Sequence, residues 1–135
     1  MLIAIALAMT PVQGGHLDYA HAMDCAVGEA VLARLLADDS AAGSAEAGSD
    51  EAGGDRAQAE RLAGLARYWF DKARAQAPDP STARADFARR QQALGDEVAA
   101  SRDAASLQGL FEARLAPCEA AMAASSETQD EPQAS

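Results

Sequence analysis

The sequence predicts an all-α fold, organised as a small four-helix bundle-like domain. Alanine supplies 36 of the 135 residues; it is the strongest helix former, whereas the β-branched residues that favour strands are scarce here. The larger apolar residues recur at helical spacing in four segments, which proline, glycine and polar stretches separate. This length fits one domain, and because alanine buries little apolar area we expect a thin core.

The first helix is expected from about Leu17 or Met23 to Ala37. Its apolar residues form two rows, which are Met23, Val27, Val31 and Leu35 on one side and Cys25, Leu32 and Leu36 on another. Such a broad apolar surface suits a helix packed between neighbours. Residues 38–54 are acidic and poor in large apolar side chains, so they predict a flexible loop. Capture of cations or basic partners by this loop is kept as an alternative role.

The second helix is the clearest and is expected over residues 55–77. Its apolar stripe consists of Ala59, Leu62, Leu65, Ala66, Trp69, Ala73 and Ala77, with Phe70 at the edge. Pro78 and Pro80 end it, because proline lacks the amide proton and restricts the residue before it.

The third helix is expected to begin at a Ser81 or Thr82 cap and to continue to about residue 100. Its apolar stripe is sparse, with Phe87, Leu94 and Val98. The fourth helix is expected to be capped by Ser101 or Asp103, and its stripe is Leu107, Leu110, Phe111, Leu115, Cys118 and Met122. Pro117 should kink or restart it. We expect residues 125–135 to form a disordered tail.

The net charge of −10 is unevenly distributed along the chain. Residues 55–119 carry ten acidic and ten basic side chains, so the surplus of acid lies in the predicted loop and tail. No basic stripe is present that would neutralise nucleic-acid phosphates, and the net charge would repel them. The sequence therefore disfavours a nucleic-acid partner.

The amino-terminal stretch resembles an export signal. "MLIAIALAM" is an apolar run far too short to span a bilayer. Cleavage is expected after Ala22, in "AHA", or after Gly14, in "VQG". No lysine or arginine precedes the run, so a short buried helix in a cytosolic protein is the alternative. We expect residues 1–22 to be a signal peptide, residues 23–124 to be the domain, and the protein to be periplasmic or secreted, not membrane-spanning.

The two cysteines, Cys25 and Cys118, fall in the first and the last predicted helices. In an exported protein an even number of cysteines predicts a disulfide. Closing this loop would disfavour the unfolded chain by about 4 to 5 kcal/mol on the chain-entropy model, a large share of the stability of a thin core. Two small buried thiols are the alternative.

One cluster offers an alternative catalytic or metal site. Asp18, His21 and Cys25 are spaced three and four residues apart, so one helix face could present them to zinc, or His21 and Cys25 could form a nucleophilic pair. However, a closed zinc site needs four ligands, and Cys118 is the natural disulfide partner. Cleavage after Ala22 would also remove both histidines. We therefore expect no metal, no cofactor and no catalytic residue, and keep a metal-dependent or thiol enzyme as the alternative.

The layout resembles that of small, uncharacterised helical proteins with a single disulfide that bacteria export. The resemblance covers residues 25–122 without the acidic loop and rests on "DCAVGEAVLARLL", "AERLAGLARYWFDKARA" and "LAPCEAAM". It implies no activity. A periplasmic acid-stress chaperone is a second analogy of architecture.

These observations predict a non-catalytic protein of the cell envelope with a binding or structural role. The best candidate for a partner or ligand surface is Tyr68, Trp69 and Phe70. Trp69 belongs to the apolar stripe, whereas Tyr68 lies about 100° away from it on the helix. If Tyr68 and Phe70 flank an open groove, a protein, a peptide or a small apolar ligand would dock there.

Overall fold

The computed structural model describes residues 17–43 and 50–130, with side chains for residues 17–39 and 54–125. It contains four helices in order, α1 (Tyr19–Gly43), α2 (Asp50–Gln76), α3 (Pro80–Ala100) and α4 (Ala104–Asp130). No strand occurs within the two described ranges. The all-α prediction is confirmed.

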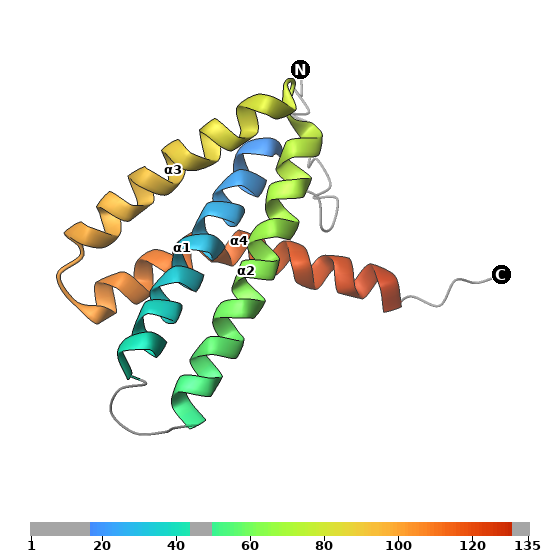
Figure 1. The fold of residues 1–135 in the computed structure, drawn as a ribbon. Coiled ribbons are helices and arrows are strands. Elements are labelled where there is room, and N and C mark those ends of the chain that lie inside the picture. Colours follow the sequence, from blue (N-terminus) through green and yellow to red (C-terminus); the bar gives the residue numbers. More distant parts are fainter. Residues whose placement is uncertain (1–16, 44–49, 131–135) are drawn as a thin grey trace, which may run out of the picture.

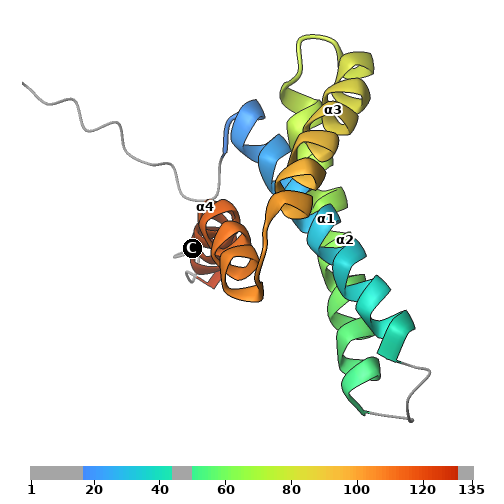
Figure 2. The ribbon, with the colours of Figure 1, turned by 90° about the vertical axis from the view of Figure 1, so that its left-hand side faces the viewer.

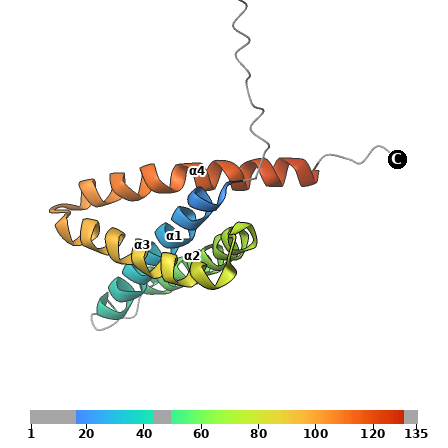
Figure 3. The same cartoon turned by 90° about the horizontal axis from the view of Figure 1, so that it is seen from above.

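Helix α1 is the centre of the fold and packs against each of the other three helices. It lies beside α2, which runs in the opposite direction, and α3 leans against the same pair (Figure 1). Helix α4 crosses the other side of α1 and extends beyond it, as Figures 2 and 3 show. Helices α2 and α3 therefore lie on one side of α1 and α4 lies on the other.

Aspartate side chains cap the amino termini of three helices. Asp18 accepts a hydrogen bond from the His21 amide at 2.9 Å, and Asp103, one of the two predicted caps, accepts one from the Ser106 amide at 2.7 Å. Helix α3 is capped by Asp79 and has proline at its first position. The predicted cap at Ser81 or Thr82 is therefore wrong, because proline is pre-organised for the first helical position and places the capping aspartate just before it.

Three helices extend further than their apolar stripes predict. Residues 38–43 belong to α1 and residues 50–54 belong to α2, so the predicted loop over 38–54 is wrong at both ends, and residues 44–49 lie outside the described residues. Residues 125–130 likewise belong to α4 rather than to a tail, and residues 131–135 lie outside the description. The reason is local: once a helix is formed, each further residue adds a backbone hydrogen bond, so a helix can extend beyond its apolar stripe.

Helix α4 continues through Pro117, so of the two expected effects, a kink or a restart, the restart is wrong. Proline removes one backbone hydrogen bond, whereas Leu115 and Cys118 on either side of it are buried against α1. This packing on both sides holds the two halves of α4 in one helix.

The core lies along α1 and consists largely of small side chains. Its largest fully buried side chains are Trp69, Met23 and Leu94. The buried cluster is Ala22, Met23, Cys25, Ala26, Val27, Val31, Trp69, Ala73, Ala83, Leu94, Phe111, Leu115, Cys118 and Ala121. Five of its fourteen members are alanines, which agrees with the thin core that the composition predicts.

Candidate ligand-binding site

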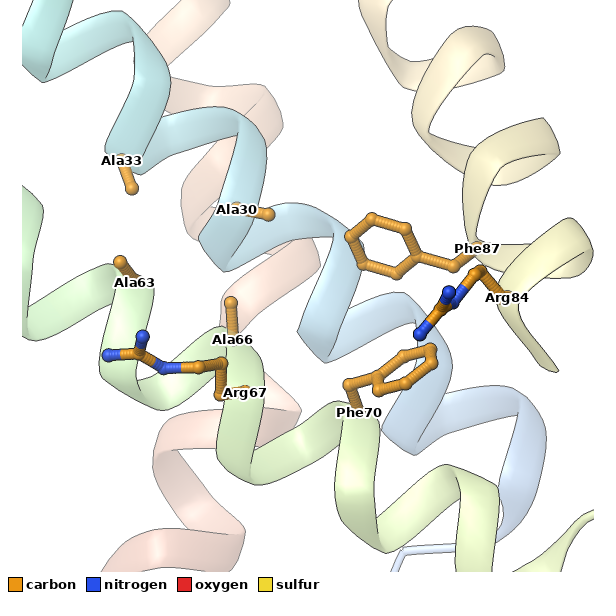
Figure 4. Close-up of a pocket in the computed structure, with 8 residues that line it drawn as sticks. All are labelled: Ala30, Ala33, Ala63, Ala66, Arg67, Phe70, Arg84 and Phe87. Atoms are coloured by element: carbon orange, nitrogen blue, oxygen red, sulfur yellow. The ribbon is translucent and has the colours of Figure 1, made fainter. Parts of the chain in front are cut away.

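An open groove lies where α1, α2 and α3 meet. Its volume is about 460 Å³, within the range of about 300 to 1,000 Å³ typical of small-molecule sites. Figure 4 shows its lining residues, which are Ala30 and Ala33 from α1, Ala63, Ala66, Arg67 and Phe70 from α2, and Arg84 and Phe87 from α3. We call this space the α1–α2–α3 groove.

The groove exists because alanines face one another where larger side chains would fill the space. The four alanine methyl groups of α1 and α2 are too short to reach α3. Two aromatic rings close one end: Phe70 and Phe87 meet edge to face with their centroids 5.6 Å apart. The walls are therefore apolar, and they would exclude water from an apolar ligand.

Two arginines are the only charged residues of this groove. Arg84 lies beside the Phe70 and Phe87 rings, and Arg67 lies further along α2, toward Ala63 (Figure 4). Both side chains are exposed. No acidic residue lines the groove, and neither guanidinium forms an ion pair with a carboxylate of the described chain. The groove therefore combines apolar walls with positive charge.

A polar network holds α3, and with it one wall of the groove, against α1. Arg90 of α3 contacts Asp24 of α1 at 2.8 Å and Asp86 of its own helix at 3.1 Å. Tyr19 of α1 donates a hydrogen bond to Asp86 at 2.8 Å. Burial acts to raise the pKa of Asp86, but hydrogen bonds from Tyr19, Arg89 and Arg90 hold that pKa below its ordinary value. The carboxylate of Asp86 thus stays charged and anchors Arg90.

The three aromatic residues predicted as a ligand surface separate in the structure. Trp69 is 2% exposed and belongs to the core. Tyr68 packs edge to face on Trp69 at 5.1 Å, and the Lys72 Nζ lies 5.4 Å from the Tyr68 ring centroid. Only Phe70 of the three lines the groove. The predicted groove flanked by Tyr68 and Phe70 is replaced by one flanked by Phe70 and Phe87.

Arg84 and Phe87 line the groove, although neither is a site residue that the sequence predicts. Phe87 was assigned to the sparse core stripe of the third helix. Because that stripe contains few large residues, Phe87 stays half-buried and is free to form a wall. A sparse stripe on a helix that faces alanines was the available signal for a groove.

The alternative cluster of Asp18, His21 and Cys25 does not converge. Asp18 and His21 pair at 2.6 Å on the exposed surface, whereas Cys25 is buried and forms the predicted disulfide with Cys118. In this disulfide the Cys25 sulfur offers no thiolate to a metal or a substrate. Among the described residues no three or more His, Cys, Asp or Glu side chains lie close enough to share a metal ion.

Glu29 is a buried carboxyl group outside the groove. It lies on α1 and is 3% exposed, and its Oε2 has no hydrogen-bond partner within the described chain. Burial raises its pKa to about 7; the charge of Glu119 on α4 adds to the rise and that of Arg61 on α2 opposes it. Glu29 is thus an acidic group whose charge is disfavoured by the fold.

A second groove, which we call the α1–α4 groove, lies between α1 and the first half of α4. Its volume is about 370 Å³, and its walls include Leu32, Leu36, Leu107 and Phe111. Unlike the first groove it is bordered by acidic side chains, among them Glu119. The two grooves therefore differ in charge although both have apolar walls.

Over the residues described, none of the four helices has a stretch long and apolar enough to cross a membrane. Comparison of the chain with protein-family models, curated proteins and solved structures found no match.

Proposed function

We propose that this protein is a non-catalytic, exported helical protein of the cell envelope that binds a small apolar ligand in the α1–α2–α3 groove. The observation that carries the proposal is the groove itself: about 460 Å³ lined by four alanines and two phenylalanines. Burying apolar ligand surface there would contribute about 25 cal/mol for each Å² removed from water.

Export is supported by the apolar amino-terminal run and by the disulfide between Cys25 and Cys118. Of the two cleavage sites, we propose that the peptidase cuts after Gly14. Ala22 is completely buried, and residues before it contact other helices: the Leu17 carbonyl accepts a hydrogen bond from Gln76 at 2.8 Å. Cleavage after Ala22 would remove these contacts and the start of α1.

The test uses a neutral apolar fluorophore, N-phenyl-1-naphthylamine, titrated with the oxidised full-length chain. We expect saturable binding with enhanced emission, and an Ala63→Phe variant, which fills the groove, should bind at least about tenfold more weakly. Ala75→Phe is the matched control, because Ala75 is an exposed residue of the same helix outside the groove. Circular dichroism confirms that both variants fold.

Equal loss of binding in both variants, or no loss in either, would place the fluorophore elsewhere and contradict the proposal. Absence of saturable binding by the wild-type chain would contradict it outright. The α1–α4 groove provides the internal comparison, because Ala63 does not line it.

A further inference from the structure

The charge around the α1–α2–α3 groove is opposite in sign to that of the whole chain. Acidic residues outnumber lysine and arginine by 21 to 11 in the sequence, yet the groove is lined by two arginines and no acidic residue. Four of the other arginines, Arg74, Arg89, Arg90 and Arg114, form ion pairs with carboxylates of the described residues. Arg67 and Arg84 form no such pair within the described chain.

This arrangement gives the groove two chemically distinct parts. The alanine and phenylalanine walls suit a hydrocarbon chain, and a guanidinium suits a carboxylate, which it can bind through two parallel hydrogen bonds. Figure 4 shows Arg84 beside the two phenylalanine rings, so a head group bound there would continue directly into the apolar space.

We propose that the ligand of this groove is a single-chain amphiphile with a carboxylate head, whose head pairs with Arg84 and whose tail lies against the alanine and phenylalanine walls, while Arg67 adds positive charge further along the groove. This inference rests on the proposed function, because it names the class of ligand for the same groove. The net charge of −10 repels an anion at long range. A preference for an anionic ligand would therefore have to come from local contacts.

The experiment compares three ligands that have the same tail and different heads: decanoate, decanol and decyltrimethylammonium. Each is titrated calorimetrically, as a monomer and near neutral pH, into the oxidised full-length chain. We expect decanoate to bind about three- to tenfold more tightly than decanol, since both guanidiniums are exposed and their ion pairs are individually weak. The cationic ligand should bind most weakly. Added salt should reduce the advantage of decanoate.

Paired variants assign the preference to the two arginines. The double variant Arg67→Gln/Arg84→Gln should bring the ratio of decanoate to decanol affinity close to one. Lys72→Gln/Arg102→Gln is the matched control, because it changes the net charge equally at two exposed positions outside the groove. The control should keep the wild-type ratio.

Four outcomes would overturn the inference. Equal affinities for decanoate and decanol would remove the head-group preference but leave the proposed function standing, as would tighter binding of the cation. Binding to vesicles of anionic phosphatidylglycerol without binding of monomeric decanoate would assign the arginines to a lipid surface. If none of the three amphiphiles binds and the neutral fluorophore does not bind either, the proposed function fails together with the inference.

Discussion

Cys25 of α1 and Cys118 of α4 are joined by a disulfide that links positions 93 residues apart, with their Cα atoms 5.8 Å from each other. Helix α4 makes its main packing contacts with α1. Helix α1 also lines the groove, together with α2 and α3. The disulfide therefore ties α4 to the central helix without taking part in the groove.

Replacing both cysteines by alanine should destabilise the protein by up to about 4 to 5 kcal/mol, the stabilisation that the chain-entropy model assigns to a loop of this length. Urea denaturation gives the change in unfolding free energy, and hydrogen exchange shows where it acts. Amides of α4 should lose protection before those of α1 and α2. Uniform loss of amide protection across all four helices would contradict the view that the disulfide stabilises the docking of α4 in particular.

Gly28 lies where α1 and α4 approach each other closely. A Cβ atom at this position would lie 2.9 Å from Cδ2 of Leu115, which is itself buried. Gly28→Ala should therefore destabilise the protein by about 1 to 2 kcal/mol in thermal or urea unfolding, because overpacking outweighs the gain in helix propensity.

Gly64→Ala is the control for this substitution, because nothing lies within 4 Å of a Cβ atom there. It should stabilise α2 by about 0.5 to 1 kcal/mol. Shortening the opposing side chain with Leu115→Ala should reduce the penalty of Gly28→Ala in a double-mutant cycle. If both glycine variants were equally stabilising, the two helices would not approach each other as described.

Glu29 should make stability fall as the pH rises. Its pKa is raised from 4.5 to about 7 by burial and by Glu119, so the folded chain retains a proton that the unfolded chain has released. This contribution is fully present below about pH 4.5 and is lost as the pH rises through about 7. Charging this group in the folded protein costs about 3 kcal/mol.

Glu29→Gln should therefore be more stable than the wild type at pH 8 and should show a flatter dependence of unfolding free energy on pH between 5 and 8. Glu60→Gln, at an exposed position of α2, should leave the slope unchanged. An unchanged slope in Glu29→Gln would mean that the carboxyl group is solvated in the folded protein.

Processing of the amino terminus gives a further prediction. After expression with export in a bacterium, the protein in the periplasmic fraction should begin at Gly15 and should resist thiol alkylation until reduced, as measured by intact mass. Recovery of a chain that begins at Met23 would contradict the proposed cleavage site. Recovery of the whole chain from the cytosol would contradict export.

The features predictable from the sequence are those set by local spacing. The apolar stripe of α2 predicted the burial of Trp69, and the positions of the two cysteines predicted their disulfide. The helix ends were less predictable, since α1 and α4 continue past their last large apolar residues. An apolar stripe indicates where packing stabilises a helix, whereas a helix can propagate beyond the stripe wherever the backbone propensity is favourable.

The groove was not predictable in the same way, because it depends on how α3 sits over α1 and α2. Helical spacing places Phe70 and Phe87 at the apolar stripes of their own helices. The contact between their rings, whose centroids are 5.6 Å apart, arises only from the tertiary arrangement. The same holds for Arg84, which in the sequence is one of several arginines on a charged helix. A site formed by residues from three helices cannot be recognised from the sequence pattern of any single helix.

The most direct test of ligand binding in the α1–α2–α3 groove is a map of backbone amide shifts by nuclear magnetic resonance, recorded on the oxidised chain during titration with decanol. If the ligand binds in this groove, saturable shifts should be concentrated on Ala30, Ala33, Ala63 and Ala66 and on the two phenylalanines beside them. Shifts concentrated instead on the α1–α4 groove around Leu107 and Phe111, or no saturable shifts at all, would contradict binding in the α1–α2–α3 groove.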